Sequence, residues 1–399
     1  MKKILICSHW MEIGGAERAL LGLLNSIDCS KYQVDLYLCR HTGEFMKFIP
    51  KEVNVLPEDP KAASIAIPIK ETLKKRFCDI VLGRVIAKIK TRNYLSKNPM
   101  DLNNIGIEYS NKYTYKYVKQ INKDVEYDLA ISFLEPHYIA AYKTNAKKKI
   151  AWMHTDYRTL SVDVEEGYKI WNQFDYIAAI SEECWRSFCE KYPLLENKLV
   201  LIENIINPHF IEQQSRCFDV GDEMADDGSI KLLSVGRFCT AKNFDNIPQI
   251  CKCLLQSGLD VKWYLIGYGG CEKLIRDKII EYGMENNVII LGKKENPYPY
   301  MANCDVYVQP SRYEGKAVSV REAQCLKKLV AITNYPTSAS QITDGYDGVV
   351  LPMNNEKCAK ALSDFIRNKS LHEKIYSNLS NMNLGNKDEV EKIYSIIES

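Results

Sequence analysis

The feature that most limits the fold of this chain is a rhythm of short apolar runs separated by helical stretches. In the C-terminal half these runs occupy 230–238, 261–269, 287–292, 304–311, 328–333 and 347–352, and in the N-terminal half 2–8, 32–39, 127–134, 148–155, 174–181 and 198–204. Short buried strands that alternate with helices imply right-handed crossovers and parallel sheets. The sequence therefore predicts an α/β protein with two doubly wound parallel-sheet domains that face each other across a cleft. Ligands of such folds bind beyond the carboxyl ends of the strands.

The length of 399 residues is enough for two or three domains with well-buried cores. We expect a first domain over 1–207, carrying a mostly helical, charged and tyrosine-rich insertion at about 57–126. Residues 208–229 are polar, acidic and aperiodic, which predicts a linker or exposed loop. A second domain follows over 230–385, and an amphipathic helix over 386–399 is expected to dock on one of the domains.

Composition excludes several classes of protein. The net charge of +2 gives no global basic field, so no nucleic-acid partner is expected. The fourteen cysteines show no metal-ligand spacing, and no secretory leader precedes them, so we expect reduced thiols and a cytoplasmic location. No apolar run approaches the length that spans a bilayer.

One segment, 69–97, is locally basic, with nine Lys or Arg against two acidic residues. Its apolar side chains recur at every fourth position, at Leu73, Phe77, Val81, Val85 and Ile89, which predicts an amphipathic helix. Two interpretations stay open. The stripe packs on the domain as in an ordinary surface helix, or the segment makes a weak peripheral contact with an anionic membrane at the inner face of the cell membrane.

Two glutamates eight positions apart follow the apolar run that ends at Gln309. Glu314 lies in the turn with Gly315 and Lys316, and a helix is predicted from about Val318, which places Glu322 one turn inside it. Backbone N–H groups at a helix start, beside a glycine and a lysine, suit a phosphate. Carboxylates accept hydrogen bonds from vicinal hydroxyls, so phosphate between two polyols describes a nucleotide sugar. The alternative is structural: Ser319-x-x-Glu322 matches a capping box.

A second polar cluster follows the first strand of the C-terminal half. In "SVGRFCTAKNFD" Arg237 stands at the strand end and Lys242 just before a helix, where both could reach a diphosphate. The alternative is a pair of solvated loop cations. The loop Gly14-Gly15 occupies the equivalent position in the first domain, and His154 ends a strand there, although a lone histidine is more often structural.

Taken together, "GGAER", "AWMHTDY", "SVGRFCTAKNFD", "NCDVYVQPSRYEG" and the spacing of Glu314 and Glu322 resemble the retaining glycosyltransferases of family four. The resemblance covers nearly the whole chain apart from 57–126. It implies the GT-B fold, in which two Rossmann-like domains surround a donor cleft. The sequences "AWMHTDY" and "EGKAVSVREAQ" are most similar to those of members that build bacterial capsule or other surface polysaccharides.

The resemblance also implies roles for individual residues. Arg237 and Lys242 match the basic pair that binds the donor diphosphate. Glu314 matches the acid that contacts the transferred sugar, and Glu322 the acid that holds the ribose. The remaining matched positions are the backbone of Gly315, Lys316, Ala317 and Val318 beside the sugar and phosphates, the loop Gly14-Gly15 near the phosphate and acceptor, and His154 near the sugar. His154, Glu314, Arg237 and Lys242 are the expected catalytic residues.

Family members work without a bound divalent metal, in agreement with the absence of an Asp-x-Asp pair here, so neither a metal nor a cofactor is expected. The expected substrates are a UDP- or GDP-sugar donor and a saccharide acceptor that is lipid-linked. Attack on the same face of the sugar keeps the anomeric configuration, and the enzyme mainly stabilises the leaving diphosphate.

The chain departs from the family in two places. Many relatives have an aromatic or aliphatic residue at the position of Lys316, and a glycine-rich turn with a glutamate where this chain has "NYPTSASQITDG", with Ser338, Ser340 and Gln341. These departures leave the donor sugar open. Two other functions also stay open: a non-hydrolysing sugar-nucleotide epimerase, which would need further cleft carboxylates, and a non-catalytic nucleotide-sugar-binding partner subunit.

Overall fold

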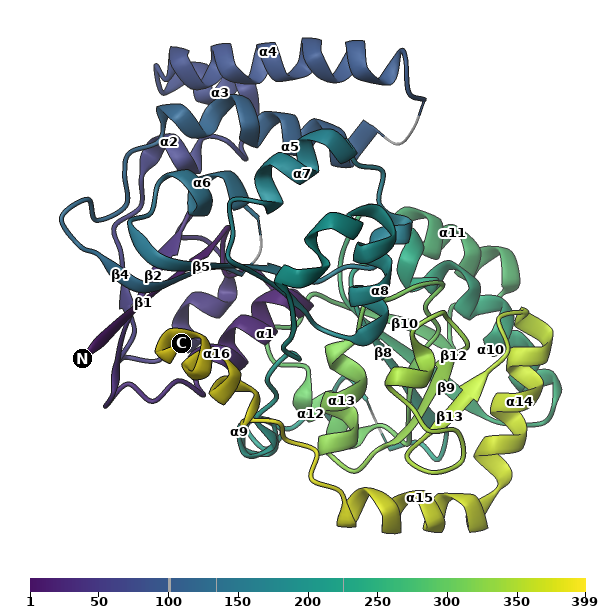
Figure 1. The fold of residues 1–399 in the computed structure, drawn as a ribbon. Coiled ribbons are helices and arrows are strands. Elements are labelled where there is room, and N and C mark those ends of the chain that lie inside the picture. The colour runs from purple at the N-terminus through teal and green to yellow at the C-terminus, as the bar shows by residue number, and fades with distance from the viewer. Residues whose placement is uncertain (100–101, 134, 225) are drawn as a thin grey trace. The chain divides into compact units, whose positions relative to one another are not determined.

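The computed structural model describes residues 1–99, 102–133, 135–224 and 226–399 and divides them into two compact units (Figure 1). Unit 1 comprises Met1–Glu12, Leu23–Glu203 and Asp388–Ser399, and unit 2 comprises Ile13–Gly22 and Asn204–Lys387. The predicted insertion, the strand predicted at 127–134 and the predicted linker each include positions outside the described residues, namely 100–101, 134 and 225.

Among the described residues of unit 1, seven strands form one parallel sheet in the order β3-β2-β1-β4-β5-β6-β7. The strands are β1 Lys2–Ser8, β2 Tyr32–Leu38, β3 Asn54–Val55, β4 Tyr127–Ser132, β5 Ala146–Met153, β6 Tyr176–Ala179 and β7 Leu199–Leu201. In β1, Ile4 pairs with Val34 on one side and Leu129 on the other, and its run of apolar side chains is fully buried. Burial on both faces explains why these strands are continuous apolar runs in the sequence.

The helices of unit 1 include a group that follows β3 and lies to one side of the sheet (Figure 1). The helices are α2 Pro60–Ala63, α3 Ile69–Lys74, α4 Cys78–Leu95, α5 Leu102–Thr114, α6 His137–Tyr142, α7 Val164–Trp171, α8 Glu182–Lys191 and α16 Glu389–Glu398. The C-terminal α16 docks through Tyr394, whose ring stacks on Tyr32 at 4.3 Å and whose hydroxyl accepts a hydrogen bond from the backbone of Asp28. Among the described residues, no helix has the length and apolar content needed to cross a membrane.

The prediction of one continuous helix over 69–97 is wrong. The helix α3 ends at Lys74, and Arg76 adopts a left-handed conformation (φ 62°) before α4 begins at Cys78. The interpretation in which the apolar stripe, with its four-residue spacing, packs on the domain is also wrong, because Leu73, Val85 and Ile89 are exposed.

Small residues cause this difference. The buried positions of α4 are Ile80, Gly83, Ala87 and Thr91, and of these Gly83 and Ala87 pack against α5. A Cβ atom at Gly83 would lie 2.5 Å from the backbone oxygen of Tyr113, so the two helices approach too closely for a larger residue. A strict period of four drifts around an α-helix of 3.6 residues per turn, and the apolar stripe therefore leaves the buried face.

The described part of unit 2 contains a six-stranded parallel sheet in the order β10-β9-β8-β11-β12-β13. The strands are β8 Ile230–Val235, β9 Val261–Ile266, β10 Val288–Gly292, β11 Val306–Gln309, β12 Leu329–Thr333 and β13 Val349–Leu351. The helices are α9 Pro208–Gln214, α10 Ile247–Gln256, α11 Glu272–Tyr282, α12 Tyr298–Asn303, α13 Val318–Cys325, α14 Asn355–Arg367 and α15 Lys369–Asn381. The predicted architecture of two parallel-sheet α/β domains is thereby confirmed.

Two segments differ from their expected assignment. Residues 208–214 form α9 rather than an irregular linker, because Asn207 accepts a hydrogen bond from the backbone of Phe210 and Pro208 occupies the first turn. The segment Ile13–Gly22, which contains most of α1 (Gly15–Leu24), belongs to unit 2 by its contacts rather than to the unit of the strands that flank it. Gly22 lies against the backbone of Ile205, where a Cβ atom would stand 2.0 Å from the carbonyl oxygen.

Candidate active site

Two loops of unit 2 meet at the carboxyl ends of adjacent strands. The strands β8 and β11 pair in parallel, so the loop after β8, with Lys242, and the loop after β11, with Glu314, emerge at the same edge of the sheet. The Lys242 Nζ atom lies 2.5 Å from Glu314 Oε1, and the two side chains are only 18% and 12% exposed. The structure thus brings together two residues that the sequence placed 72 positions apart.

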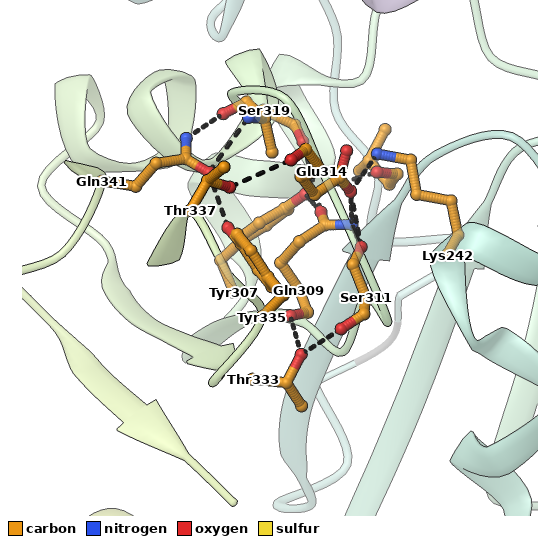
Figure 2. Close-up of polar contacts among 12 residues, drawn as sticks. Lys242, Tyr307, Gln309, Ser311, Glu314, Ser319, Thr333, Tyr335, Thr337 and Gln341 are labelled. Atoms are coloured by element: carbon orange, nitrogen blue, oxygen red, sulfur yellow. Dashed lines mark hydrogen bonds and ion pairs between the residues drawn. The ribbon is translucent and has the colours of Figure 1, made fainter. Parts of the chain in front are cut away.

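The carboxylate of Glu314 is held by further donors on the same oxygen. Ser311 Oγ donates to Oε1 at 2.5 Å, and Gln309 Nε2 donates to it at 3.3 Å (Figure 2). Gln309 also donates to Ser311 and accepts from Tyr307 at 2.7 Å, so each member of this small network has a second partner. The network fixes the Glu314 side chain before any ligand arrives.

Contacts outside this network tie the two loops to each other. The guanidinium of Arg312, in the loop after β11, donates twice to Asp245 at 3.0 and 2.8 Å. Burial raises the pKa of Asp245, but the two charge-assisted bonds from Arg312 outweigh it, and the net shift is downward. Asn243, in left-handed conformation at φ 62°, donates to the carbonyl oxygen of Pro310 at 2.9 Å. These contacts set the position of Lys242 relative to Glu314.

The backbone between Glu314 and α13 is clamped by the segment that departs from the family pattern. Gln341 accepts from the N–H of Ala317 at 3.0 Å and donates to its carbonyl oxygen at 2.8 Å. Tyr335 donates to the same Gln341 oxygen, and Thr337 donates to the carbonyl oxygen of Glu314 at 3.0 Å (Figure 2). One side chain therefore fixes the entry of the chain into the helix.

Glu322 is buried, with 2% of its surface exposed, and both of its oxygens have partners. Tyr298 donates to Oε1 at 2.7 Å and Arg18 donates to Oε2 at 2.9 Å. The capping-box alternative is wrong, because Ala317 is the N-cap residue of α13 and the Ser319 hydroxyl donates to Gln309. The N-cap contributes no side-chain hydrogen bond, which leaves the helix start suited to an anion.

The other predicted donor-binding residues of unit 2 lie around this cluster. Arg237 is exposed directly after β8, and within the described residues its side chain makes no hydrogen bond or ion pair. Gly315 and Lys316 are half-buried in the loop before α13, and Val318 begins that helix. Close packing fixes the Arg237 loop, since a Cβ atom at Gly267 would lie 1.9 Å from the carbonyl oxygen of Gly236.

Gly14 and Gly15 stand at the start of α1. A Cβ atom at Gly14 would lie 2.1 Å from Glu17 Oε2, so any other residue there would displace that buried carboxylate. At Gly15 the same atom would meet nothing within 4 Å. A larger residue at Gly14 therefore needs the Glu17 side chain to move, whereas one at Gly15 does not.

His154 belongs to unit 1, at the end of β5, and is therefore not in the same unit as Glu314 and Lys242. Its Nε2 lies 2.7 Å from the carbonyl oxygen of Phe133, which assigns the proton of the neutral ring to that nitrogen. Burial lowers the pKa of His154 to about 4, so the ring is uncharged at neutral pH. The neighbouring Asp156 caps a short helix and pairs with Arg158.

Three residues of the site escaped the sequence analysis. Arg18 lies in the quoted "GGAER" motif, and its ion pair to Glu322 joins positions 304 apart. Tyr298 comes from α12, and Gln341 was noted only as a departure from the family pattern. A buried carboxylate needs a partner, but the sequence analysis did not predict that Glu322 is buried, so nothing pointed to Arg18.

Sequence comparison identifies the second half of the chain. Residues 219–382 match the family model described as glycosyl transferases group 1. An N-acetylgalactosaminyltransferase of Campylobacter jejuni, named for an acceptor that carries diphospho-undecaprenol, is 27% identical over 142 residues, which are 35% of this chain and 38% of that protein. The capsular polysaccharide biosynthesis glycosyltransferase CapM of Staphylococcus aureus is 27% identical over 146 residues, again 38% of its own length. The chain thus spans less than half the length of these curated relatives.

Structural comparison covers the whole chain. A glycosyltransferase from Rickettsia africae has a TM-score of 0.68 at 16% identity, with 100% of this chain and 98% of that one covered. Anabaena HepE, solved in complex with UDP and glucose, has a TM-score of 0.70 at 15% identity and full coverage of both chains. At these identities the likeness concerns the fold alone. The similarity to family four glycosyltransferases is thereby confirmed: residues 219–382 form a glycosyl transferases group 1 domain, in a chain that has the GT-B fold of two Rossmann-like domains.

Proposed function

We propose that this chain is a retaining, metal-independent glycosyltransferase. It moves a hexosyl or N-acetylhexosaminyl group from a UDP- or GDP-sugar to a lipid-linked saccharide at the inner face of the cell membrane, in the synthesis of a surface polysaccharide. The observation that carries the proposal is the pairing of Lys242 with Glu314 at the carboxyl ends of β8 and β11, beside the start of α13.

The charges of this cluster suit a sugar diphosphate. In the absence of ligand, Lys242 and Glu314 neutralise each other. A bound diphosphate would attract Lys242 and the exposed Arg237, while Glu314 would accept hydrogen bonds from hydroxyls of the transferred sugar. The Ala317 N–H already donates to Gln341, so the phosphates would be met by the other backbone N–H groups of Gly315 to Val318 at the start of α13.

Catalysis would then consist mainly of charge stabilisation. As the glycosidic bond to the diphosphate breaks, negative charge develops on the leaving oxygen, and fixed cations stabilise it without reorganisation. The acceptor hydroxyl attacks from the same face and its proton goes to the departing phosphate. The anomeric configuration is retained, and no protein nucleophile is needed.

The identity of the donor base is supported only by analogy of fold. HepE structures hold UDP, UDP with glucose, and UDP-glucose, which favours a uridine nucleotide here. The name of the Campylobacter relative specifies an acceptor on diphospho-undecaprenol, which favours a lipid-linked acceptor. The position of Glu322 between Tyr298 and Arg18 requires that a ribose share or replace one of these contacts.

A donor screen tests the proposal. The full chain is mixed with UDP-GlcNAc, UDP-GalNAc, UDP-glucose or GDP-mannose, and its thermal unfolding is followed. A ligand at 100 times its Kd adds about 2.7 kcal/mol to the folded state. Slow hydrolysis of the stabilising donor without acceptor distinguishes an enzyme from a binding subunit. If no nucleotide sugar stabilises the protein, the proposed donor class is wrong.

A peripheral contact with the membrane is part of the proposal. Because apolar side chains of the segment are exposed, we expect this contact to involve them as well as the charges. We define the basic apolar face as the exposed side chains of α3, of α4 and of the turn between them. Its apolar members are Leu73, Leu82, Val85 and Ile89, and its cations are Lys70, Lys74, Lys75, Arg76, Lys88, Lys90 and Arg92. Arg84 is not a member, because its guanidinium donates to the carbonyl oxygen of Ile67. Since the apolar side chains are exposed, they are available to the lipid together with the charges.

Co-sedimentation with vesicles separates the two contributions. Each cation near an anionic surface adds about 1 kcal/mol, attenuated by salt. Binding to phosphatidylglycerol vesicles should therefore weaken on replacement of Lys74, Lys75, Lys88 and Lys90 by glutamine, and also on replacement of Leu82, Val85 and Ile89 by serine. Leu194→Ser, an exposed leucine elsewhere in unit 1, is the matched control. Equal binding to neutral vesicles would contradict the charge argument.

A further inference from the structure

Unit 1 contains a cavity of about 240 Å³ whose residues are, with the exception of His154, not part of the proposed donor site. It lies at the end of β5, and α5, α6 and α7 contribute side chains to its wall. One water molecule accounts for roughly 30 Å³ of liquid volume, so this cavity has room for several waters or for one pyranose ring.

A buried donor without a partner lines this cavity. Trp152 is 1% exposed, and its indole Nε1–H makes no hydrogen bond within the part of the chain that the structure describes. Leaving a buried donor unsatisfied costs about 1–3 kcal/mol, so native proteins usually provide a partner. A ligand with an acceptor oxygen would supply one here.

A pair of polar side chains leaves a gap of suitable size for a hydroxyl. His137 Nε2 lies 4.0 Å from Glu135 Oε1, too far for a direct hydrogen bond, while its Nδ1 is engaged by Ser132 Oγ at 2.7 Å. Both His137 and Glu135 line the cavity. A polar pair at this separation is commonly bridged by a water or by a ligand hydroxyl.

Glu108 adds a group that can both donate and accept. It comes from α5, and burial, followed by the charges of Glu135 and Asp163, raises its pKa to about 8. At neutral pH the carboxyl is therefore largely protonated, with an O–H to donate and a carbonyl oxygen to accept. Glu108 belongs to the inserted helical region, which the family resemblance does not cover.

The remaining wall is mostly aromatic and aliphatic, with Tyr157, Trp171 and Ile170 among its members. Within the described residues, no lysine or arginine side chain lines the cavity. Such a site suits a neutral ring with several hydroxyls rather than a diphosphate, which would need cations.

We propose that this cavity binds one neutral saccharide ring of the acceptor, with Trp152 Nε1, Glu108 and the Glu135–His137 pair as the groups that select it. The identification of the saccharide as the acceptor rests on the proposed function, whereas the binding of a saccharide in this cavity does not. It makes the inserted helix α5 a determinant of acceptor specificity.

Saturation-transfer NMR tests the proposal without requiring turnover. The probes are the methyl α-glycosides of GlcNAc, GalNAc and glucose, added one at a time to the full chain. We expect saturation transfer to at least one glycoside, and a roughly tenfold weaker affinity in Trp152→Phe, which removes the N–H and keeps an aromatic ring. Glu108→Ala should weaken binding similarly, and Glu108→Gln less, because the amide retains a donor and an acceptor. Trp185→Phe on α8 and Glu165→Gln on α7, neither of which lines the cavity, are the matched controls.

Stabilisation by UDP, measured on the same samples, reports on the donor site and on correct folding. Loss of glycoside binding in Trp152→Phe and Glu108→Ala, with the UDP effect intact, supports the proposal. Absence of binding by every glycoside to the wild-type chain, or equal binding by wild type and both variants, would overturn it. Failure of the transferase assay with glycoside binding intact would count against the proposed function and not against the saccharide site.

Discussion

Replacement of Lys242 by alanine separates the catalytic role of this residue from its structural one. Lys242 Nζ lies 2.5 Å from Glu314 Oε1 with little solvent access to either side chain. At an effective dielectric constant of about 20, unit charges at roughly 4 Å attract by about 4 kcal/mol, but desolvation of both groups offsets most of this. Ser311 and Gln309 continue to donate to Glu314 in the variant. We therefore expect the free energy of unfolding to fall by only about 1 to 2 kcal/mol.

The effect on the reaction should be larger. Loss of one fixed donor to a developing charge typically costs about 100- to 1000-fold in rate, or roughly 2.7–4 kcal/mol. The assay is UDP or GDP release with the stabilising donor, expressed as kcat/KM, beside urea unfolding of the same samples. Lys360→Ala, exposed on α14, is the control, and Lys242→Arg should keep part of the rate because it keeps the charge. A folded Lys242→Ala enzyme with near wild-type turnover would refute the assignment of Lys242 to the diphosphate. Arg237→Ala, measured in the same assay, tests the assignment of the second cation independently.

Three further outcomes follow from the contacts. Glu322→Gln leaves the buried guanidinium of Arg18 facing a neutral amide, so stability should fall by about 1–3 kcal/mol and affinity for bare UDP or GDP should drop in calorimetric titration; unchanged nucleotide affinity would restrict Glu322 to a structural role. Gln341→Ala removes both bonds to Ala317 and should lower kcat more than it raises the donor KM; an unchanged kcat would show that the clamp is dispensable. His154 has a folded pKa of about 4, below its ordinary value of about 6.5, so its neutral form stabilises the fold above pH 6.5 and this contribution is lost as pH falls toward 4. Urea unfolding across that range should therefore show a steeper loss for wild type than for His154→Asn, and parallel curves would exclude the effect.

The sheets could be predicted because parallel strands buried on both faces leave an unbroken apolar signature. Their carboxyl ends then identify the loops with Lys242 and Glu314, since adjacent parallel strands end at one edge. The partners of Glu322 could not be predicted, because Tyr298 and Arg18 approach it through tertiary packing and not through spacing. The hydrogen bonds of Gln341 to Ala317 could not be predicted either, because in the sequence this segment is only a departure from the family pattern.

The segment 69–97 shows the opposite error, in which a regular pattern misled. One of the two interpretations placed the apolar stripe of this segment against the domain, but Gly83 and Ala87 pack closely against α5, and Leu73, Val85 and Ile89 are exposed. Hydrophobic periodicity locates a face, whereas close helix packing selects small residues that carry a weak apolar signal. The cavity beside α5 was equally invisible, because its lining comes from elements far apart in the sequence.

The stereochemistry of the product is a direct test of the proposed retaining transfer. The full chain would be incubated with the donor that stabilises it and a short-chain lipid diphosphate saccharide, and the anomeric proton of the new linkage would be observed by NMR. We expect a single transferred sugar with the α configuration of the donor, formed by wild type and strongly reduced in Lys242→Ala. A β-linked product, or no transfer with any nucleotide sugar that the protein binds, would contradict it.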